Sequence, residues 1–193
     1  PNKNSFFTDD NYLFVGNWYG QTDSNLYAFN KTTLAFEFAV TEATLECSGG
    51  LSLNDTIYIG QKSKSAIDDC PPYGCYADTT GSIIVADANT GAYHRTIDLG
   101  AAGAGVSQIY NEGNFLFAVC ATTNKVLKIE IGTDVITEIS LPAFTQSFMK
   151  QGSKIYLDLN EKAGYLDLAD ESLALSATEL KGVAIAYDPS NET

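Results

Sequence analysis

One short pattern recurs four times along the chain and constrains its fold more than any other feature. In each copy a polar turn precedes a four-residue apolar segment, and these segments are residues 12–15, 56–59, 115–118 and 154–157. Strand-like segments flank each one, one before it and two after it. In the last copy residues 170–182 also fit a helix, but the alternation of Leu173 and Leu175 favours a strand. The pattern therefore predicts four units of four strands each.

The spacing of the copies predicts how the units pack. Leu13, Ile57, Leu116 and Ile155 are equivalent positions, at intervals of 44, 59 and 39 residues. A period near 40 residues with four strands per repeat is typical of β-propeller blades. A four-stranded blade covers both of its faces only by stacking between neighbours. We therefore expect an all-β propeller of about four antiparallel blades in a single domain.

The blade boundaries follow from the same register. They are expected at residues 4–46, 47–104, 105–144 and 145–181, with an insertion at residues 62–81 that explains the longest interval. Residues 182–193 contain one further strand-like segment, which is a surplus. It indicates a piece of a longer propeller, a displaced terminal strand, or a strand that pairs with another molecule in self-assembly.

One turn carries a resemblance to known repeats. Residues 84–91, Ile-Val-Ala-Asp-Ala-Asn-Thr-Gly, resemble the repeats of YVTN-type and PQQ-like propellers, and residues 26–33 are a weaker copy. The resemblance implies the fold alone, because such propellers serve as enzymes, scaffolds and surface proteins. The quinone-dependent members have recurrent tryptophans, whereas this chain has only Trp18, so no PQQ cofactor is implied.

The cysteines point to a secreted, extracellular protein. In the predicted blades Cys47, Cys70, Cys75 and Cys120 all fall on one face, and an even number of cysteines favours disulfides in an exported chain. Bonds between Cys70 and Cys75 and between Cys47 and Cys120 make one of three connectivities that the sequence leaves open. A four-cysteine zinc site is less favoured, because two of the thiols lack a close partner.

Three glycosylation sequons map to the opposite face. They begin at Asn30, Asn54 and Asn191. Glycans there would leave the cysteine face open for contact, so we expect the binding surface on the cysteine face.

Aromatic and acidic side chains mark that surface. The candidate binding residues are Trp18, Tyr19, Asp68, Asp69, Tyr73, Tyr76 and Asp78. Such a mixture suits a protein or a carbohydrate partner, although these residues equally suit a role in covering their own loops. The three aspartates in this set offer oxygen ligands for Ca²⁺ but do not follow the EF-hand spacing. The favoured interpretation is therefore that they are solvated surface acids.

Charge and missing motifs narrow the classes of function. The net charge of −13, from 24 acids and 11 bases, argues against nucleic-acid binding, and no apolar run approaches the ~20 residues of a membrane helix. His94 is the one histidine and is expected at the surface, and no nucleophile elbow or phosphate-binding loop occurs. The sequence favours a binding or structural module, and in the structural version the chain is a subunit of an extracellular assembly. An extracellular lyase or lactonase that uses carboxylates and Ca²⁺ is the alternative.

Overall fold

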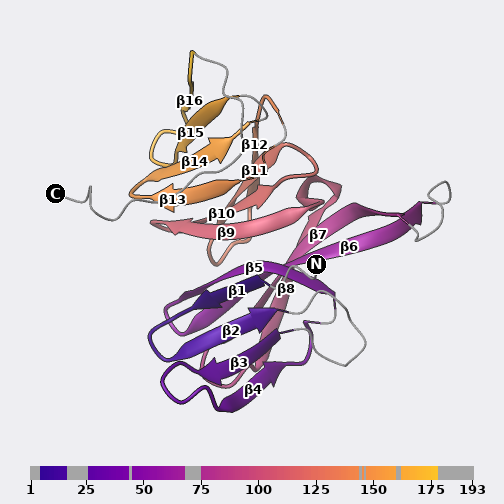
Figure 1. The fold of residues 1–193 in the computed structure, drawn as a ribbon, viewed down its shortest axis with the longest axis vertical. Coiled ribbons are helices and arrows are strands. Elements are labelled where there is room, and N and C mark those ends of the chain that lie inside the picture. Colours follow the sequence, from indigo (N-terminus) through magenta and orange to yellow (C-terminus); the bar gives the residue numbers. More distant parts are fainter. Residues whose placement is uncertain are drawn as a thin grey trace.

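The computed structural model describes residues 5–16, 26–43, 45–67, 75–143, 145, 147–159 and 162–177, with backbone alone at residues 5, 64–67 and 75–77. These residues form four separate antiparallel sheets of four strands (Figure 1). The first sheet contains β1 (Ser5–Thr8), β2 (Tyr12–Gly16), β3 (Leu26–Asn30) and β4 (Phe36–Val40). The second contains β5 (Glu46–Leu53), β6 (Thr56–Ile67), β7 (Cys75–Asp87) and β8 (Tyr93–Gly100). The third contains β9 (Val106–Glu112), β10 (Phe115–Cys120), β11 (Lys125–Glu130) and β12 (Ile136–Ser140). The fourth contains β13 (Phe148–Gln151), β14 (Lys154–Asp158), β15 (Ala163–Asp167) and β16 (Leu173–Leu175).

Each sheet is a meander whose strands neighbour one another in chain order. The prediction of four four-stranded antiparallel units is confirmed, and so is the choice of a strand for residues 173–175. The surplus segment of residues 182–193 lies outside the described residues. In Figure 1 the sheets follow one another along the long axis, so the first and fourth sheets lie at opposite ends. No helix in the described part of the chain has the length and apolar character needed to cross a membrane.

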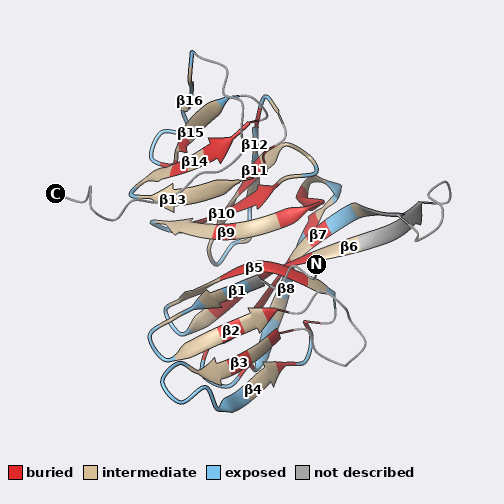
Figure 2. Ribbon diagram, in the orientation of Figure 1, coloured by how far each residue is buried: buried red, intermediate tan, exposed pale blue. Residues whose placement is uncertain are grey.

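Apolar side chains fill the three interfaces between consecutive sheets. Figure 2 shows the buried residues along the strands of the sheets. Strand β7 shows how one strand serves two interfaces. Ile84 and Ala86 pack toward the first sheet, whereas Ile83 and Val85 pack toward the third. Successive side chains of a strand point to opposite faces, so an uninterrupted apolar run is what a strand between two sheets requires.

The first strands of the sheets approach one another closely. A Cβ atom on Gly49 of β5 would lie 1.9 Å from Gln108 Oε1 of β9, and one on Gly50 would lie 2.3 Å from the Phe7 ring of β1. These two positions have no room for a side chain. The Gly49–Gly50 pair therefore lets β5 lie between the first strands of the two neighbouring sheets.

The turn between the third and fourth strands repeats in all four sheets. Leu34, Gly91, Asp134 and Glu171 occupy the same turn position, with φ values of 58°, 73°, 58° and 62°. In the second sheet Asp87 Oδ1 accepts hydrogen bonds from the backbone N–H groups of Asn89 and Thr90 and from the Thr90 hydroxyl. These bonds favour the ionised form, with the Thr90 side chain as the largest cause, and lower the pKa of Asp87.

The predicted insertion at residues 62–81 continues the strands of the second sheet instead of forming a loop. Strands β6 and β7 pair from Thr56 and Asp87 outward to Ile67 and Cys75, with a bulge between Ser63 and Lys64. The neighbouring strands end earlier, since β5 pairs with β6 up to Lys62 and β8 pairs with β7 up to Gly81. Residues 63–67 and 75–80 therefore form a two-stranded extension, called the ribbon below, that projects beside the stack in Figure 1.

Candidate functional site: the base of the ribbon

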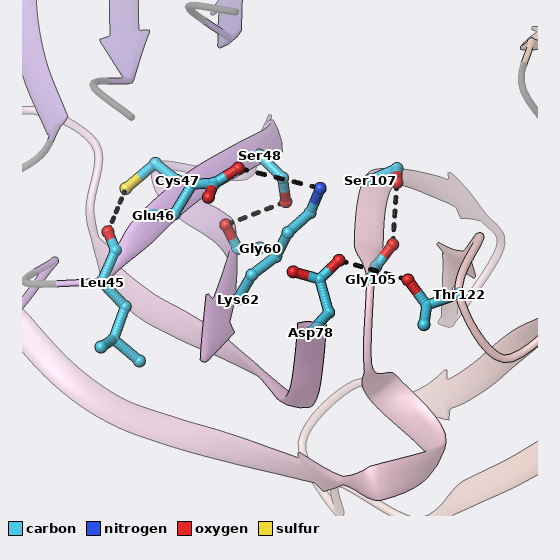
Figure 3. Close-up of polar contacts among 10 residues, drawn as sticks. All are labelled: Leu45, Glu46, Cys47, Ser48, Gly60, Lys62, Asp78, Gly105, Ser107 and Thr122. Atoms are coloured by element: carbon cyan, nitrogen blue, oxygen red, sulfur yellow. Dashed lines mark hydrogen bonds and ion pairs between the residues drawn. The ribbon is translucent and has the colours of Figure 1, made fainter. Parts of the chain in front are cut away.

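The ribbon leaves the second sheet at a cluster of polar residues. This cluster lies on the cysteine face, where the sequence predicts the binding surface. We call this cluster the ribbon base, and it consists of Glu46, Ser48, Lys62, Asp78, Ser107 and Thr122 (Figure 3). These residues come from β5, β6, β7, β9 and the β10–β11 turn. Two sheets therefore contribute to the cluster.

An ion pair ties the first strand of the ribbon to β5. Lys62 Nζ lies 4.0 Å from Glu46 Oε1, and the two side chains are only 17% and 15% exposed (Figure 3). Because both groups are largely removed from water, their attraction is screened less than that of a surface pair. The pair therefore fixes the point at which β6 leaves the sheet.

A hydrogen bond ties the second strand of the ribbon to the third sheet. The Thr122 hydroxyl donates to Asp78 Oδ2 at 3.2 Å. Glycines permit the close approach beneath this contact. A Cβ atom on Gly105 would lie 2.1 Å from Thr122 Oγ1, and one on Gly81 would lie 2.1 Å from the carbonyl oxygen of Gly103. The ribbon is thus held on two sides at its base, while its outer part extends away.

The serine hydroxyls of the ribbon base hold the backbone in place. Ser48 Oγ donates to the carbonyl oxygen of Gly60 at 3.2 Å, across the bulge between β5 and β6. Ser107 Oγ donates to the carbonyl oxygen of Gly105 at 2.8 Å. Neither contact places a general base against the hydroxyl, so these contacts support structure and do not activate a nucleophile.

Cys47 and Cys120 are not joined in a disulfide, which is one of the connectivities that the sequence left open, and both thiols are free and buried. The reason is their position, because Cys47 packs between the first and second sheets and Cys120 packs between the second and third. Their Sγ atoms donate instead to the carbonyl oxygens of Leu45 and Ala118, at 3.7 and 3.6 Å. Burial raises the pKa of each thiol to about 12, so both stay protonated near neutral pH.

Half of the predicted site residues lie outside the described part of the chain. Trp18, Tyr19, Asp68, Asp69, Cys70, Tyr73 and Asn191 lie outside the described residues, and Cys75 and Tyr76 are described only by their backbone in β7. Asp78 is placed, at the ribbon base. Within the described residues, no group of three or more His, Cys, Asp or Glu side chains is arranged to hold a metal ion.

Sequence reasoning missed Glu46, Lys62 and Thr122 as partners within the ribbon base. Their contacts depend on strand register, which the sequence does not display. The signal that was present is the Gly49–Gly50 pair, because adjacent glycines within a strand mark a close approach of another backbone.

The opposite end of the first two sheets holds the two described sequons and a polar cavity. Asn54 is exposed in the β5–β6 turn, and Asn30 is half-buried at the end of β3, where its Oδ1 accepts the N–H groups of Thr32 and Thr33. The cavity has a volume of about 360 Å³, and Asp9, Asn54 and Asp55 are among its lining residues. Asp9 is already engaged by the backbone N–H groups of Asn11 and Tyr12 and by the Ser52 hydroxyl. His94 is exposed at the start of β8.

Comparison with known proteins identifies the fold. No protein-family model matches the chain, and no curated protein matches it significantly in sequence. The designed protein Ika8 matches with a TM-score of 0.62 at 15% identity, over 94% of this chain and 52% of its own. A nidogen/laminin complex matches with a TM-score of 0.62 at 11% identity, over 84% and 57%. The designed protein Ika4 matches with a TM-score of 0.57 at 10% identity, over 89% and 88%.

These likenesses confirm the predicted β-propeller fold, since propeller proteins are among the matching structures. The chain spans just over half the length of the first two matched chains. At these low identities the comparison shows the fold alone, and the YVTN-type and PQQ-like resemblance is a likeness of sequence only.

Proposed function

We propose that this β-propeller is a protein-binding module that takes an extended segment of its partner along an edge of the ribbon. The observation that carries the proposal is the pairing of the ribbon. Beyond Lys62 and Gly81, β6 and β7 pair with each other and with no other described strand. Each ribbon strand therefore has an outer edge that no strand in the described part of the chain covers.

An uncovered strand edge presents backbone N–H and C=O groups that can bind an extended peptide as an added strand. Backbone hydrogen bonds then supply affinity, and alternate side chains of the peptide supply specificity. The ribbon base prepares the surface for this role. The Lys62–Glu46 and Thr122–Asp78 contacts fix the start of both strands, which lowers the entropy that is lost when a partner binds.

The charge of the chain favours a partner segment with basic residues. A net charge of −13 attracts a cationic segment over long range and raises its association rate at low ionic strength. The use of a propeller in recognition has a parallel in the nidogen/laminin complex, a structure of one protein bound to another.

We also propose that the module is extracellular and carries glycans at Asn30 and Asn54. Both residues lie in turns at the strand ends away from the ribbon base, so glycans there would leave the ribbon accessible. The mass of the protein from its natural source, measured before and after enzymatic removal of N-glycans, tests this part. An unchanged mass would contradict it.

The binding proposal is tested by shortening the ribbon. Replacing residues 63–80 by Asn-Gly joins Lys62 to Gly81, a cross-strand pair, through a two-residue hairpin turn. Linear peptides are selected from a displayed library on the wild-type chain, and their Kd values are then compared on both proteins. We expect at least tenfold weaker binding to the shortened chain and unchanged binding to a His94→Ser control at the opposite end. Peptides that bind both chains equally would contradict the proposal.

A further inference from the structure

The outer face of the first sheet is apolar and exposed. Cross-strand pairing places Phe6 beside Val15 and Leu13 beside Phe29, on the face opposite the one that packs against the second sheet. Phe6 is 74% exposed and Phe36 is 58% exposed. The ring centre of Phe36 lies 6.1 Å from that of Phe29. Large apolar side chains gathered on one face indicate a surface that another molecule covers.

The outer face of the fourth sheet is also rich in aromatic groups. Tyr156 and Tyr165 are paired across β14 and β15 with ring centres 5.9 Å apart, and Met149 pairs with Tyr156 from β13. The apolar residues Ile155, Leu157 and Leu166 point the other way, into the interface with the third sheet. The outer face of the first sheet therefore carries mainly phenylalanine and aliphatic side chains, whereas that of the fourth sheet carries tyrosines.

The three interfaces inside the stack show which residues of one sheet contact the next sheet. At all three, the left-handed turn residue of one sheet contacts the sheet before it. A Cβ atom on Gly91 would lie 2.7 Å from the Phe38 ring. Asp134 Oδ2 lies 2.9 Å from Arg95 Nε, and Glu171 Oε1 lies 2.5 Å from Lys128 Nζ.

The same position at the free end of the first sheet is Leu34, which is 65% exposed at a φ of 58°. At the other end, the fourth sheet carries the same pair of a lysine and an aromatic ring as the third, but with the two positions exchanged, since Tyr165 stands where Lys128 does and Lys154 where Phe115 does. Lys128 Nζ lies 4.1 Å from the ring centre of Phe115, and Lys154 Nζ lies 4.1 Å from the ring centre of Tyr165. A sheet stacked on the fourth would therefore bring its turn residue onto Tyr165 beside Lys154. A leucine fits the tyrosine ring and the aliphatic stem of the lysine.

A second set of contacts between neighbouring sheets also supports packing of the first sheet on the fourth. Asp9 of the first sheet meets Ser52 of the second at 3.1 Å, and Glu112 of the third meets Lys150 of the fourth at 3.0 Å. By strand register, the equivalent residues at the free ends are Gln151 of the fourth sheet and Thr8 of the first. Both are polar, and an amide and a hydroxyl can form a hydrogen bond.

We propose that two copies of this chain join so that the first sheet of each packs on the fourth sheet of the other, which closes a ring of eight blades. Two identical contacts related by a two-fold axis satisfy both ends of both copies. The contact buries Phe6, Leu34 and Phe36, whose exposure is otherwise unfavourable. Four sheets of this kind match just over half of the Ika8 chain and most of the Ika4 chain, which fits a half-ring unit.

Native mass spectrometry of the 193-residue chain tests the ring. We expect a species of twice the 20.7 kDa mass of one chain. A monomer, or an open series of larger multiples, would overturn the proposal. The substitutions Leu34→Glu and Leu34→Lys then test which surfaces meet, because the two variants share the same strained turn and differ in charge.

Leu34→Glu should keep the dimer, since the new carboxylate would lie on Tyr165 within reach of the Lys154 ammonium group. Leu34→Lys should raise the dimer Kd at least tenfold through repulsion from Lys154, and Lys154→Glu added to it should restore assembly. Val135→Lys, at an exposed turn position of an interior sheet, is the control and should have no effect. Circular dichroism confirms that each variant is folded. A dimer indifferent to Leu34→Lys, or a double variant that stays dissociated, would overturn the proposed interface.

The rival occupant of an end face is the segment 182–193 of this chain. Ile185→Pro would prevent that segment from pairing as a strand. We expect the dimer to survive this substitution. Its conversion to a folded monomer would assign the interface to the terminal segment and overturn the end-face contact.

Discussion

Lys128 and Glu171 join the third and fourth sheets through an ion pair, with the lysine Nζ 2.5 Å from the glutamate Oε1. The same ammonium group lies 4.1 Å from the centre of the Phe115 ring. The side chains of Lys128 and Glu171 are 21% and 36% exposed. The pair therefore lies at the rim of an interface that apolar residues fill, and it orients the two sheets more than it holds them together.

Removing this pair should have a small, salt-dependent effect. Glu171→Gln should lower the free energy of unfolding by about 0.5–1 kcal/mol at low ionic strength, because the lysine loses its partner across the interface. The difference should shrink in 1 M salt. Urea unfolding at both salt concentrations measures it. Glu138→Gln, which breaks the Lys125–Glu138 pair within the third sheet, is the matched control and should cost no more. A larger loss at Glu138 would contradict the role given to Glu171.

Gly49→Ala should be more damaging. The added methyl group would overlap Gln108 Oε1 and the Ser107 carbonyl oxygen, at 1.9 and 2.6 Å, and the backbone of β9 cannot move away without opening the interface. We expect a loss of about 2 kcal/mol in the free energy of unfolding. Gly113→Asn is the control, because its turn position faces open space and asparagine tolerates a positive φ. Equal stability of the two variants would show that β5 and β9 do not lie this close.

Cys47 and Cys120 should resist thiol reagents in the folded protein. Their burial raises both pKa values to about 12, so at pH 8 almost no thiolate is present, and the packed sheets exclude the reagent. Alkylation at pH 8 followed by peptide mass spectrometry should leave both residues unmodified until denaturant is added. Rapid labelling of either residue in the folded chain would contradict its place between two sheets.

The same burial predicts a loss of stability in alkali. The ordinary thiol pKa of 9.0 applies to the unfolded chain, and the folded value is about 12. The folded state therefore binds more protons between these values, and the stability present below about pH 9 is lost as the pH rises toward 12. Each pKa unit of separation corresponds to about 1.4 kcal/mol. Urea midpoints from pH 7 to 10.5 should fall less steeply for Cys47→Ala than for the wild type. Parallel curves would contradict the raised pKa.

The sequence was sufficient to predict the four sheets because each strand is determined by the apolar pattern of its own short segment. The period of equivalent residues from Leu13 to Ile155 reports that each unit has the same four strands, and the alternation within β7 reports that it serves two interfaces. The segment after Lys62 was predicted only as an insertion. Its serines and lysines lack the apolar alternation of a half-buried strand, and pairing with β7 alone makes it a ribbon.

The sequence could not assemble the candidate site, because the site depends on contacts between sheets. The hydrogen bond between Asp78 and Thr122 joins two residues that are 44 positions apart in the chain and belong to different sheets. The cysteines show the same limit. Cys47 and Cys120 both lie at the ribbon end of their strands, but their side chains point into different interfaces, and that direction follows from strand register and not from position along the chain.

The central claim, that the ribbon edges receive an extended segment, is tested most directly by amide hydrogen exchange. The exchange of residues 63–67 and 75–80 is measured in the free chain and with a saturating ribbon-selected peptide. We predict new protection of alternate amides along one ribbon strand, because an added strand pairs with every second residue of its neighbour. Protection confined to other parts of the chain, with the ribbon amides unchanged, would contradict the account.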